Sequence, residues 1–251
     1  MAVRGWPLDT RLPANIQYVR GGTGTAVRVR AMNVEKYLVG PVVVLSGVAL
    51  IAGCGGSDGK SGTSQAAAKY DISKVGGVKS SLPAGYDPMD LEQDTVTQEK
   101  LDAPGVGALT TTPPSVVTPA ECASLLKPLA PAGVGAKAEG FVGSNQEGHT
   151  IIVVAAEAAK NAGELGHAGC DHITVDTTDG VTATVDRVPG PDIAGAKTMG
   201  VQAHITANGK SIEEATYTAV MGDKTVAVVQ ADIDPQVAKD LLVKVVAALK
   251  G

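Results

Sequence analysis

Residues 171–188, DHITVDTTDGVTATVDRV, decide the fold class of this chain. Apolar side chains alternate with threonine and aspartate on both sides of Asp179-Gly180. The apolar positions are Ile173, Val175, Val181, Ala183 and Val185. A period of two is typical of a half-buried β-strand, and Asp-Gly is a strong signal for a tight hairpin turn. The stretch therefore predicts an antiparallel hairpin with one apolar face.

The same pattern continues on either side of this hairpin. Residues 201–205 alternate up to Asn208-Gly209, which predicts a second hairpin, and residues 221–224 turn the chain again into TVAVVQ. Upstream, the apolar run 151–156 fits a central strand or a buried helix. Because the turns are too short for helical crossovers, we expect a largely antiparallel sheet with one polar face.

Two helices are predicted to flank these strands. Thr118 precedes a proline and stands three residues before Glu121, which is the pattern of a capping box with proline in the first turn. At the other end Asp234 and Pro235 start a helix with one apolar stripe. The predicted fold is α+β: a largely antiparallel sheet with a short N-terminal helix and a C-terminal amphipathic helix packed on one face, over residues 118–251.

The predicted core consists of small side chains, because the whole chain has only one Phe. Five strand alanines are expected to face Ala238 and Leu242 of the last helix: Ala183, Ala203, Ala215, Ala219 and Ala227. Either the helices pack closely on the sheet or these small residues line a cavity, and close packing is the usual outcome.

An uncharged apolar block ends at Cys54. Residues 38–53 are shorter than the roughly 20 residues of a membrane-spanning helix, and Lys36 and the arginines before it supply the positive region of a secretory signal peptide. Residues 51–54, Ile-Ala-Gly-Cys, resemble the bacterial lipobox, which implies cleavage before Cys54 and acylation of its thiol with fatty acids such as palmitate. The other interpretation is a short buried segment with an incidental cysteine.

These features divide the chain into segments. Residues 1–31 have no hydrophobic period, so we expect translation to start near Met32, residues 32–53 to be the signal peptide and residues 54–70 to be a flexible tether. Residues 71–117 end in a Thr/Pro-rich stretch and are expected to be irregular. The predicted location is the extracytoplasmic face of the cell membrane, with the membrane as a partner through the lipid anchor.

The charge of the exported part excludes one class of partner. The chain has 21 Lys/Arg and 26 Asp/Glu residues, of which six and two precede Cys54, so the remainder has a formal net charge of −9. Arg187 is its only arginine. Nucleic acids and anionic membrane faces are held by clustered basic side chains, so neither is expected as a main ligand.

The two remaining cysteines, Cys122 and Cys170, are expected to form a disulfide, since disulfides persist in exported proteins. The alternative is a metal site at His167, Cys170 and His172. No catalytic set and no cofactor site are predicted. Glu213 and Glu214 are adjacent in a strand and diverge, so a solvated hairpin edge is preferred to an acid/base pair.

Several of these motifs together resemble a known type of protein. The lipobox, the Thr/Pro-rich linker, the segment TPAECASLL, a later cysteine before antiparallel hairpins and the C-terminal helix resemble an actinobacterial envelope lipoprotein of the mycobacterial type with a domain of unknown function. Residues 115–251 are more loosely similar to the extracytoplasmic sensor domains of mycobacterial serine/threonine kinases, which usually carry two disulfides where this chain can form one. The resemblance implies a binding or sensor-like module for a small envelope ligand or lipid, without enzymatic activity; the alternative is a structural lipoprotein that docks another envelope protein.

Overall fold

The computed structural model describes residues 69–102, 115–177, 180–207 and 209–250. The predicted leader, the signal peptide and the lipobox with Cys54 lie outside the described residues, as do most of the tether and residues 103–114. The described residues belong to one compact unit, Ser61–Gly251. Within the described ranges no helix combines the length and the apolar character that crossing a bilayer requires.

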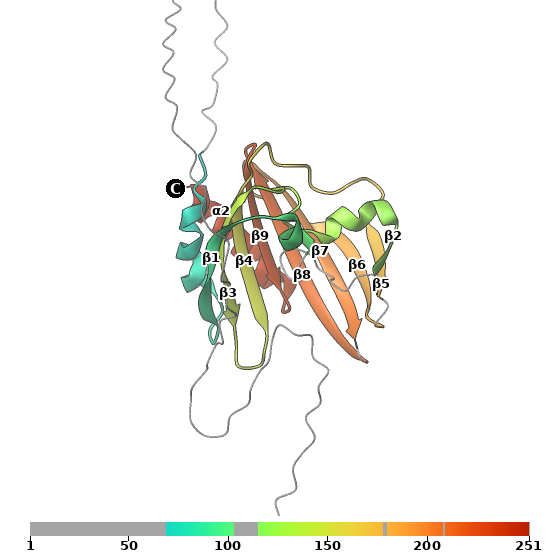
Figure 1. The fold of residues 1–251 in the computed structure, drawn as a ribbon. Helices are drawn as coiled ribbons and strands as arrows, with labels where there is room; N and C mark the ends of the chain where they lie inside the picture. Colours follow the sequence, from blue (N-terminus) through green and yellow to red (C-terminus); the bar gives the residue numbers. More distant parts are fainter. Residues whose placement is uncertain (1–68, 103–114, 178–179, 208, 251) are drawn as a thin grey trace, which may run out of the picture. The chain divides into compact units, whose positions relative to one another are not determined.

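A sheet of nine strands forms the centre of the described part, and every pair of neighbouring strands in it is antiparallel. The strand order is β1-β3-β4-β9-β8-β7-β6-β5-β2 (Figure 1). The strands are β1 (Asp87–Thr95), β2 (Ser115–Thr118), β3 (Lys137–Ser144), β4 (Thr150–Glu157), β5 (His172–Thr177), β6 (Thr182–Pro189), β7 (Ala196–Ala207), β8 (Lys210–Met221) and β9 (Thr225–Ala231). The predicted α+β class with a largely antiparallel sheet is confirmed.

The hairpins are also confirmed. β5 and β6 pair with Ile173 opposite Val185 and Val175 opposite Ala183. β7 and β8 form the second hairpin, and β8 turns directly into β9. The apolar run 151–156 lies in β4, a central strand between β3 and β9.

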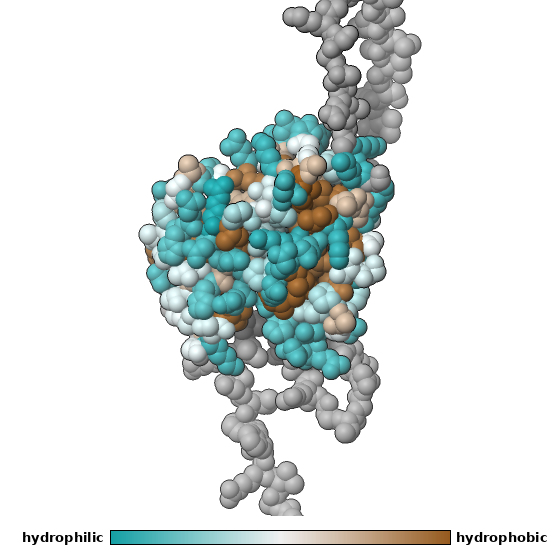
Figure 2. Space-filling view, turned by 180° about the vertical axis from the view of Figure 1, so that it is seen from behind, coloured by the Kyte–Doolittle hydropathy of each residue, from teal (hydrophilic) through white to brown (hydrophobic). Residues whose placement is uncertain are grey.

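One face of the sheet, which we call the α2 face, is covered by α2 (Pro235–Lys250) and the 3-10 helix η1 (Ile72–Ser81). The backbone N–H of Gln236 donates to Asp234 Oδ1 over 2.9 Å, so Asp234 caps α2 as predicted. The predicted apolar stripe of α2 is buried in the core beneath it. Seen from this side, apolar patches lie among hydrophilic side chains (Figure 2).

The opposite face, which we call the η2 face, is covered by the 3-10 helix η2 (Ala120–Leu126) and by α1 (Gln98–Asp102). In Figure 1, η2 lies in front of the sheet and α2 behind it. The prediction that the N-terminal and C-terminal helices share one face is therefore wrong. Central strands such as β9 are apolar at successive positions, so both of their faces need a cover.

The start of η2 also differs from the prediction. Thr118 is the last residue of β2, where it pairs with Thr174 of β5. The Thr118–Pro119 peptide bond is cis, and the helix begins at Ala120 without a side-chain cap. Because Thr118 belongs to the sheet, its side chain does not form the predicted capping box.

The segment 71–117 is not irregular as predicted, since its described residues contain η1, β1, α1 and β2. β1 is an edge strand that pairs with β3 alone, and all nine of its residues are exposed. An edge strand with both faces in solvent has no apolar alternation, which is why its sequence DPMDLEQDT carries no strand signal.

Aromatic side chains help to close the core beneath α2. Tyr217 and Phe141 are fully buried there, and a side chain at Gly200 would collide with the Tyr217 ring, since a Cβ would lie 2.3 Å from Cε1. Glycine on β7 therefore makes room for a tyrosine on β8. Of the five alanines expected under α2, Ala183 and Ala203 lie on the η2 face instead.

Candidate functional site

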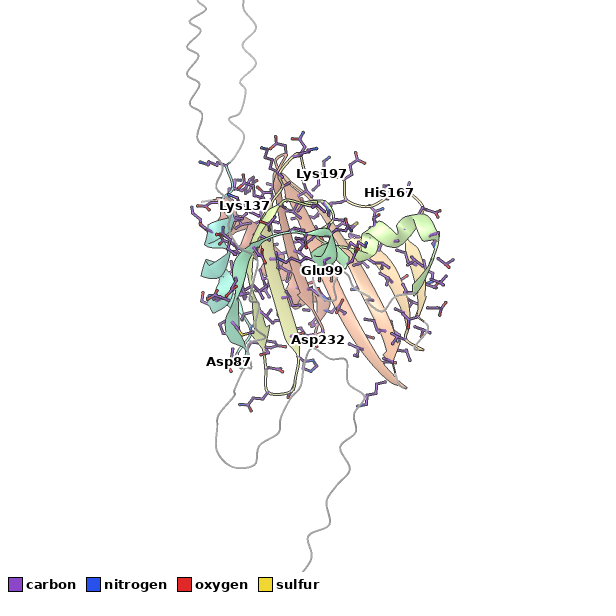
Figure 3. All side chains as sticks on the ribbon, viewed as in Figure 1. Asp87, Glu99, Lys137, His167, Lys197 and Asp232 are labelled. Atoms are coloured by element: carbon purple, nitrogen blue, oxygen red, sulfur yellow. A yellow bond between two sulfur atoms is a disulfide. The ribbon has the colours of Figure 1, made fainter. Side chains whose placement is uncertain are left out.

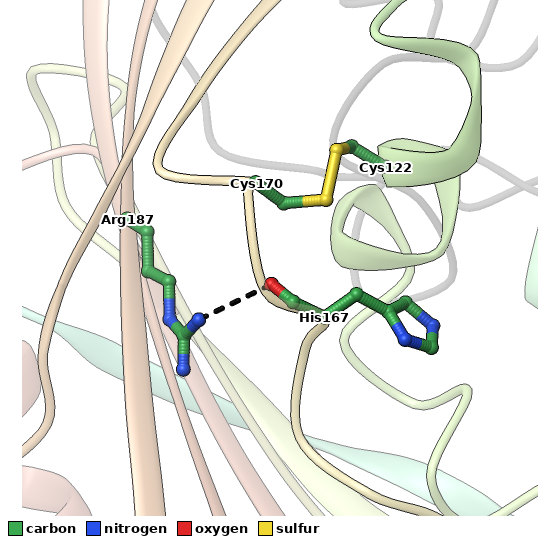
Figure 4. The surroundings of a disulfide bond; sticks show 4 residues. All are labelled: Cys122, His167, Cys170 and Arg187. Atoms are coloured by element: carbon green, nitrogen blue, oxygen red, sulfur yellow. Dashed lines mark hydrogen bonds between the residues drawn. A yellow bond between two sulfur atoms is a disulfide. The ribbon is translucent and has the colours of Figure 1, made fainter.

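A disulfide joins η2 to the loop before β5. Cys122 and Cys170 are fully buried, their Cα atoms lie 5.5 Å apart, and 48 residues of sequence separate them (Figure 4). Leu125 and Leu126 of η2 pack beside the disulfide on apolar side chains of β5, β6 and β7. The bond therefore holds a short helix and a long loop against the same part of the sheet.

The alternative metal site at His167, Cys170 and His172 does not form. The sulfur of Cys170 is bonded to Cys122, and the Nδ1 atom of His172 lies 2.6 Å from Asp186 Oδ1. His172 and Asp186 pair across β5 and β6 on the side of the sheet opposite to Ile173, which faces the disulfide cluster. In the part of the chain that the structure describes, no three potential ligands gather into a metal site.

A cavity of about 110 Å³ lies on the η2 face, next to the disulfide. One wall is the end of η2 and the turn after it, with Leu125, Lys127 and Pro128. The other wall is the loop 163–167, and Figure 3 shows His167 beside η2. The disulfide thus links the two segments that form the walls. The floor is the sheet itself, with side chains of β7 and β8: Met199, Val201, Thr216 and Thr218.

The floor of the cavity is unusually polar for a sheet centre. Thr216 and Thr218 are each only 2% exposed. Gln230, which lies opposite Thr216 on β9 but does not line the cavity, is 5% exposed. Thr216 Oγ1 and Gln230 Oε1 are buried and have no hydrogen-bond partner among the described residues. An unpaired buried polar group costs about 1–3 kcal/mol, so the cavity retains polar atoms that the fold alone would disfavour.

Glu214 continues this polar row along β8. Its Oε1 atom is also buried without a partner among the described residues. Burial raises the pKa of Glu214 to about 7; a hydrogen bond from Gln230 opposes this rise, and the charge of Asp232 adds to it. The expectation that both glutamates lie on a solvated edge is therefore wrong for Glu214, whereas Glu213 on the opposite face is exposed.

Arg187 on β6 lies at the rim of this cavity. Its Nη1 atom donates to the backbone carbonyl of His167 over 3.4 Å (Figure 4). Within the described ranges no carboxylate forms an ion pair with its guanidinium. Lys127, which lines the cavity, is paired with Asp102 instead. Arg187 is thus a cation beside the cavity that has no carboxylate partner among the described residues.

A second cavity of about 220 Å³ lies near the start of α2. Its lining includes Asp186, Gln202, His204 and Glu213. The exposed His204 has its Nδ1 3.8 Å from Glu213 Oε1. Glu214, whose buried Oε1 atom has no partner among the described residues, also lines this cavity. The cavity beneath η2 differs from it in its apolar walls, which include Leu125, Pro128 and Met199.

Sequence reasoning missed the residues that make the cavity. Thr216 and Thr218 line the cavity, and Glu214 lines the second cavity. The three occupy alternate positions of β8, and this polar alternation was the signal that could have marked a second, polar side of the strand. The loop 163–167 carries no motif, and its approach to η2 follows from the disulfide. Arg187 stands out in the sequence only as the single arginine of the exported part.

The fold and the cavity define a class: an antiparallel α+β domain in which a disulfide joins the two walls of a small cavity. The chain belongs to the DUF5642 family, a domain of unknown function, whose model matches residues 71–250. The match begins ahead of the boundary predicted at Thr118. No curated protein matches the chain.

Two solved structures are similar to this chain. An uncharacterised protein from Mycobacterium smegmatis, the Rv0999 ortholog, matches with 22% identity and a TM-score of 0.60, over 73% of this chain and 98% of that chain. The extracellular domain of PknH from Mycobacterium tuberculosis matches with 13% identity and a TM-score of 0.39, over 72% of this chain and 92% of that chain. The similarity to the Mycobacterium smegmatis protein establishes a shared fold. The match covers 98% of that protein, so that protein consists almost entirely of this fold.

Proposed function

We propose that this chain is a lipid-anchored, extracytoplasmic binding module that holds a small ligand or head group in the cavity beneath η2. The lipobox motif at Cys54 supports the anchor, because two or three acyl chains hold a protein stably on a membrane where one is marginal. The buried disulfide supports export, since such bonds persist in oxidising compartments. The module has a binding role and carries out no reaction.

The hydroxyl of Thr216 is the observation that carries the binding function. It is buried, lines the cavity and has no partner among the described residues. Valine has the same shape and would remove the unpaired hydroxyl, so threonine at this position is explained by something that hydrogen-bonds to it.

The volume of the cavity limits the ligand. About 110 Å³ is less than the roughly 150 Å³ of a cavity that accommodates benzene, and well below the roughly 300 Å³ at which drug-sized pockets begin. The proposal is therefore recognition of a small molecule, or of one group of a larger molecule that extends through the mouth. Carriage of a whole lipid is not supported by this cavity.

Native mass spectrometry of residues 61–251, purified from an actinobacterial host, tests the binding function. This fragment is a compact unit, and the similar Mycobacterium smegmatis chain consists of the same fold alone. We expect a bound small molecule on the wild-type fragment and its loss from Thr216→Val, with Thr216→Ser as the control that keeps the hydroxyl. A wild-type fragment free of any ligand would contradict the proposal.

An interaction lipoprotein is the second candidate, and the edge strand β1 favours it. Met89 and Leu91 on β1 are 64% and 37% exposed, and the outer edge of this strand is unpaired in the sheet of the described residues. A photo-crosslinker at position 89 in cells would capture an envelope partner if β1 is a docking edge. Crosslinks to a defined partner, combined with a ligand-free cavity, would favour this function over ligand binding.

The lipid anchor has a separate test. Intact mass of the membrane-bound protein should correspond to a chain that starts at Cys54 and carries acyl groups, and Cys54→Ala should abolish the acylated species. A mature chain that retains residues 1–31 would contradict both the anchor and the start at Met32.

A further inference from the structure

We infer that the cavity beneath η2 takes a compact carboxylate, which Arg187 holds at the rim with a fork of two hydrogen bonds. This inference rests on the binding function proposed above and names the chemistry of the ligand.

Arg187 and Thr216 belong to one row across the sheet. Arg187 of β6 pairs with Val201 of β7, and Val201 pairs with Thr216 of β8. Residues in such a row point to the same face, and strands lie about 4.8 Å apart, so the two backbones are about 10 Å apart with the cavity floor between them. A ligand above Val201 therefore has a guanidinium on one side and a buried hydroxyl on the other.

The guanidinium of Arg187 lies directly against the cavity wall. A methyl group placed on Gly166 would meet Met199 Sδ at 3.0 Å, Leu125 Cδ2 at 3.2 Å and Arg187 Cζ at 3.5 Å. Gly166, Met199 and Leu125 all line the cavity. The guanidinium of Arg187 thus lies beside Gly166, next to the apolar side chains of Met199 and Leu125.

Most hydrogen-bond donors of Arg187 are free to bind a ligand. A guanidinium has five N–H donors, and among the described residues the side chain makes one hydrogen bond, to the His167 carbonyl at 3.4 Å. This distance is longer than the usual 2.9–3.0 Å or so. A carboxylate matches the planar fork of arginine with two parallel hydrogen bonds, which makes it the preferred partner for these donors.

The charge around the cavity favours a single negative charge on the ligand. Asp102 already neutralises Lys127, and Glu164 adds a negative charge to the lining. Among the lysine and arginine side chains that the structure describes at this cavity, only Arg187 is left to balance an anion, so a monoanion fits and a phosphate dianion would be repelled. A carboxylate is the common biological monoanion that also matches the fork.

The rest of the ligand is expected to be apolar and short. Leu125, Pro128, Met199 and Val201 line the cavity next to Arg187, and the volume of about 110 Å³ admits a group smaller than benzene. The carboxylate can belong to a free short-chain acid or to a longer amphiphile that leaves through the mouth. Both sources share the same contact with Arg187.

Calorimetric titration of the 61–251 fragment with propionate, propionamide, palmitate and inorganic phosphate tests the inference. The variants are Arg187→Gln, Arg187→Lys and, as a control with the same loss of charge, Lys244→Gln on the exposed side of α2. We expect propionate to bind the wild type and Lys244→Gln equally, and Arg187→Gln at least tenfold more weakly. Arg187→Lys keeps the charge but loses the fork, so its affinity should fall between the two.

The outcomes separate this inference from the proposed function. Binding of palmitate but not propionate, lost in Arg187→Gln, supports the carboxylate and assigns it to an amphiphile. Equal binding of propionate and propionamide, equal binding by Arg187→Gln, or tighter binding of phosphate overturns the inference, although a ligand found by native mass spectrometry would still support the binding function. If no probe binds and no ligand co-purifies, both fail. Since Arg187 is exposed, an unchanged melting temperature of Arg187→Gln would exclude unfolding as the cause.

Discussion

Removal of the disulfide should destabilise the domain and open the cavity. Replacing Cys122 and Cys170 together by alanine removes a cross-link between residues 48 apart. In the chain-entropy treatment, a loop of this length is worth about 4 kcal/mol of unfolding free energy. A domain of 150–250 residues or so loses about 2–4 °C of melting temperature per kcal/mol, so we expect a decrease of about 8–16 °C.

The loss of stability should be greatest in the two segments that the disulfide joins, η2 and the loop before β5. η2 has seven residues in a 3-10 helix, which is too short to be stable without tertiary contacts. The core beneath α2 does not include either cysteine, so it should stay folded. Hydrogen exchange should therefore accelerate over η2 and residues 163–170, with little change over α2. Because these segments form the walls of the cavity, the affinity for the ligand should also fall.

Differential scanning calorimetry of the double variant measures the change in stability. The wild type, reduced while unfolded and refolded with reductant, should melt at the temperature of the double variant, and reductant should leave the variant itself unchanged. A decrease below about 3 °C would refute the entropic argument. Two free thiols in the untreated, denatured wild type would refute the disulfide itself.

Three other changes have defined consequences. Gly200→Ala places a methyl group 2.3 Å from Tyr217 Cε1 and 2.8 Å from Val188 Cγ2, so chemical denaturation should show a loss of about 1–3 kcal/mol, and unchanged stability would contradict the packing of Tyr217 on β7. Asp234→Ala removes the cap of α2 and should cost about 1 kcal/mol by the same measurement, whereas Asp234→Asn should cost little. The pKa of Glu214 is about 7 in the folded protein against an ordinary 4.5, so its protonated form stabilises the fold fully below pH 4.5, and about 3 kcal/mol is lost as the pH rises to 7. Glu214→Gln should therefore be more stable than the wild type at pH 8 and nearly equal to it at pH 5, and equal denaturation midpoints at pH 8 would contradict this.

Local patterns in the sequence were sufficient to predict the strands and helices that have one buried and one exposed side. The hairpin of β5 and β6 and the helix α2 each bury one side, so alternation and an apolar stripe identified them correctly. β1 and β3 lack such a pattern. β1 is exposed on every residue, and β3 carries Gly140 and Gly143, where a side chain would collide with Val153 and Leu82.

The sequence by itself determined the class of fold, the pairing of adjacent strands and the capped C-terminal helix, because these depend on residues close together in the chain. The tertiary structure alone decided which face each helix covers and where the cavity lies. Arg187, Val201 and Thr216 become one row only through the pairing of three strands, and the loop 163–167 meets η2 across a disulfide that spans 48 residues. A periodicity records which side of a strand is buried, but it does not record which distant segment buries it.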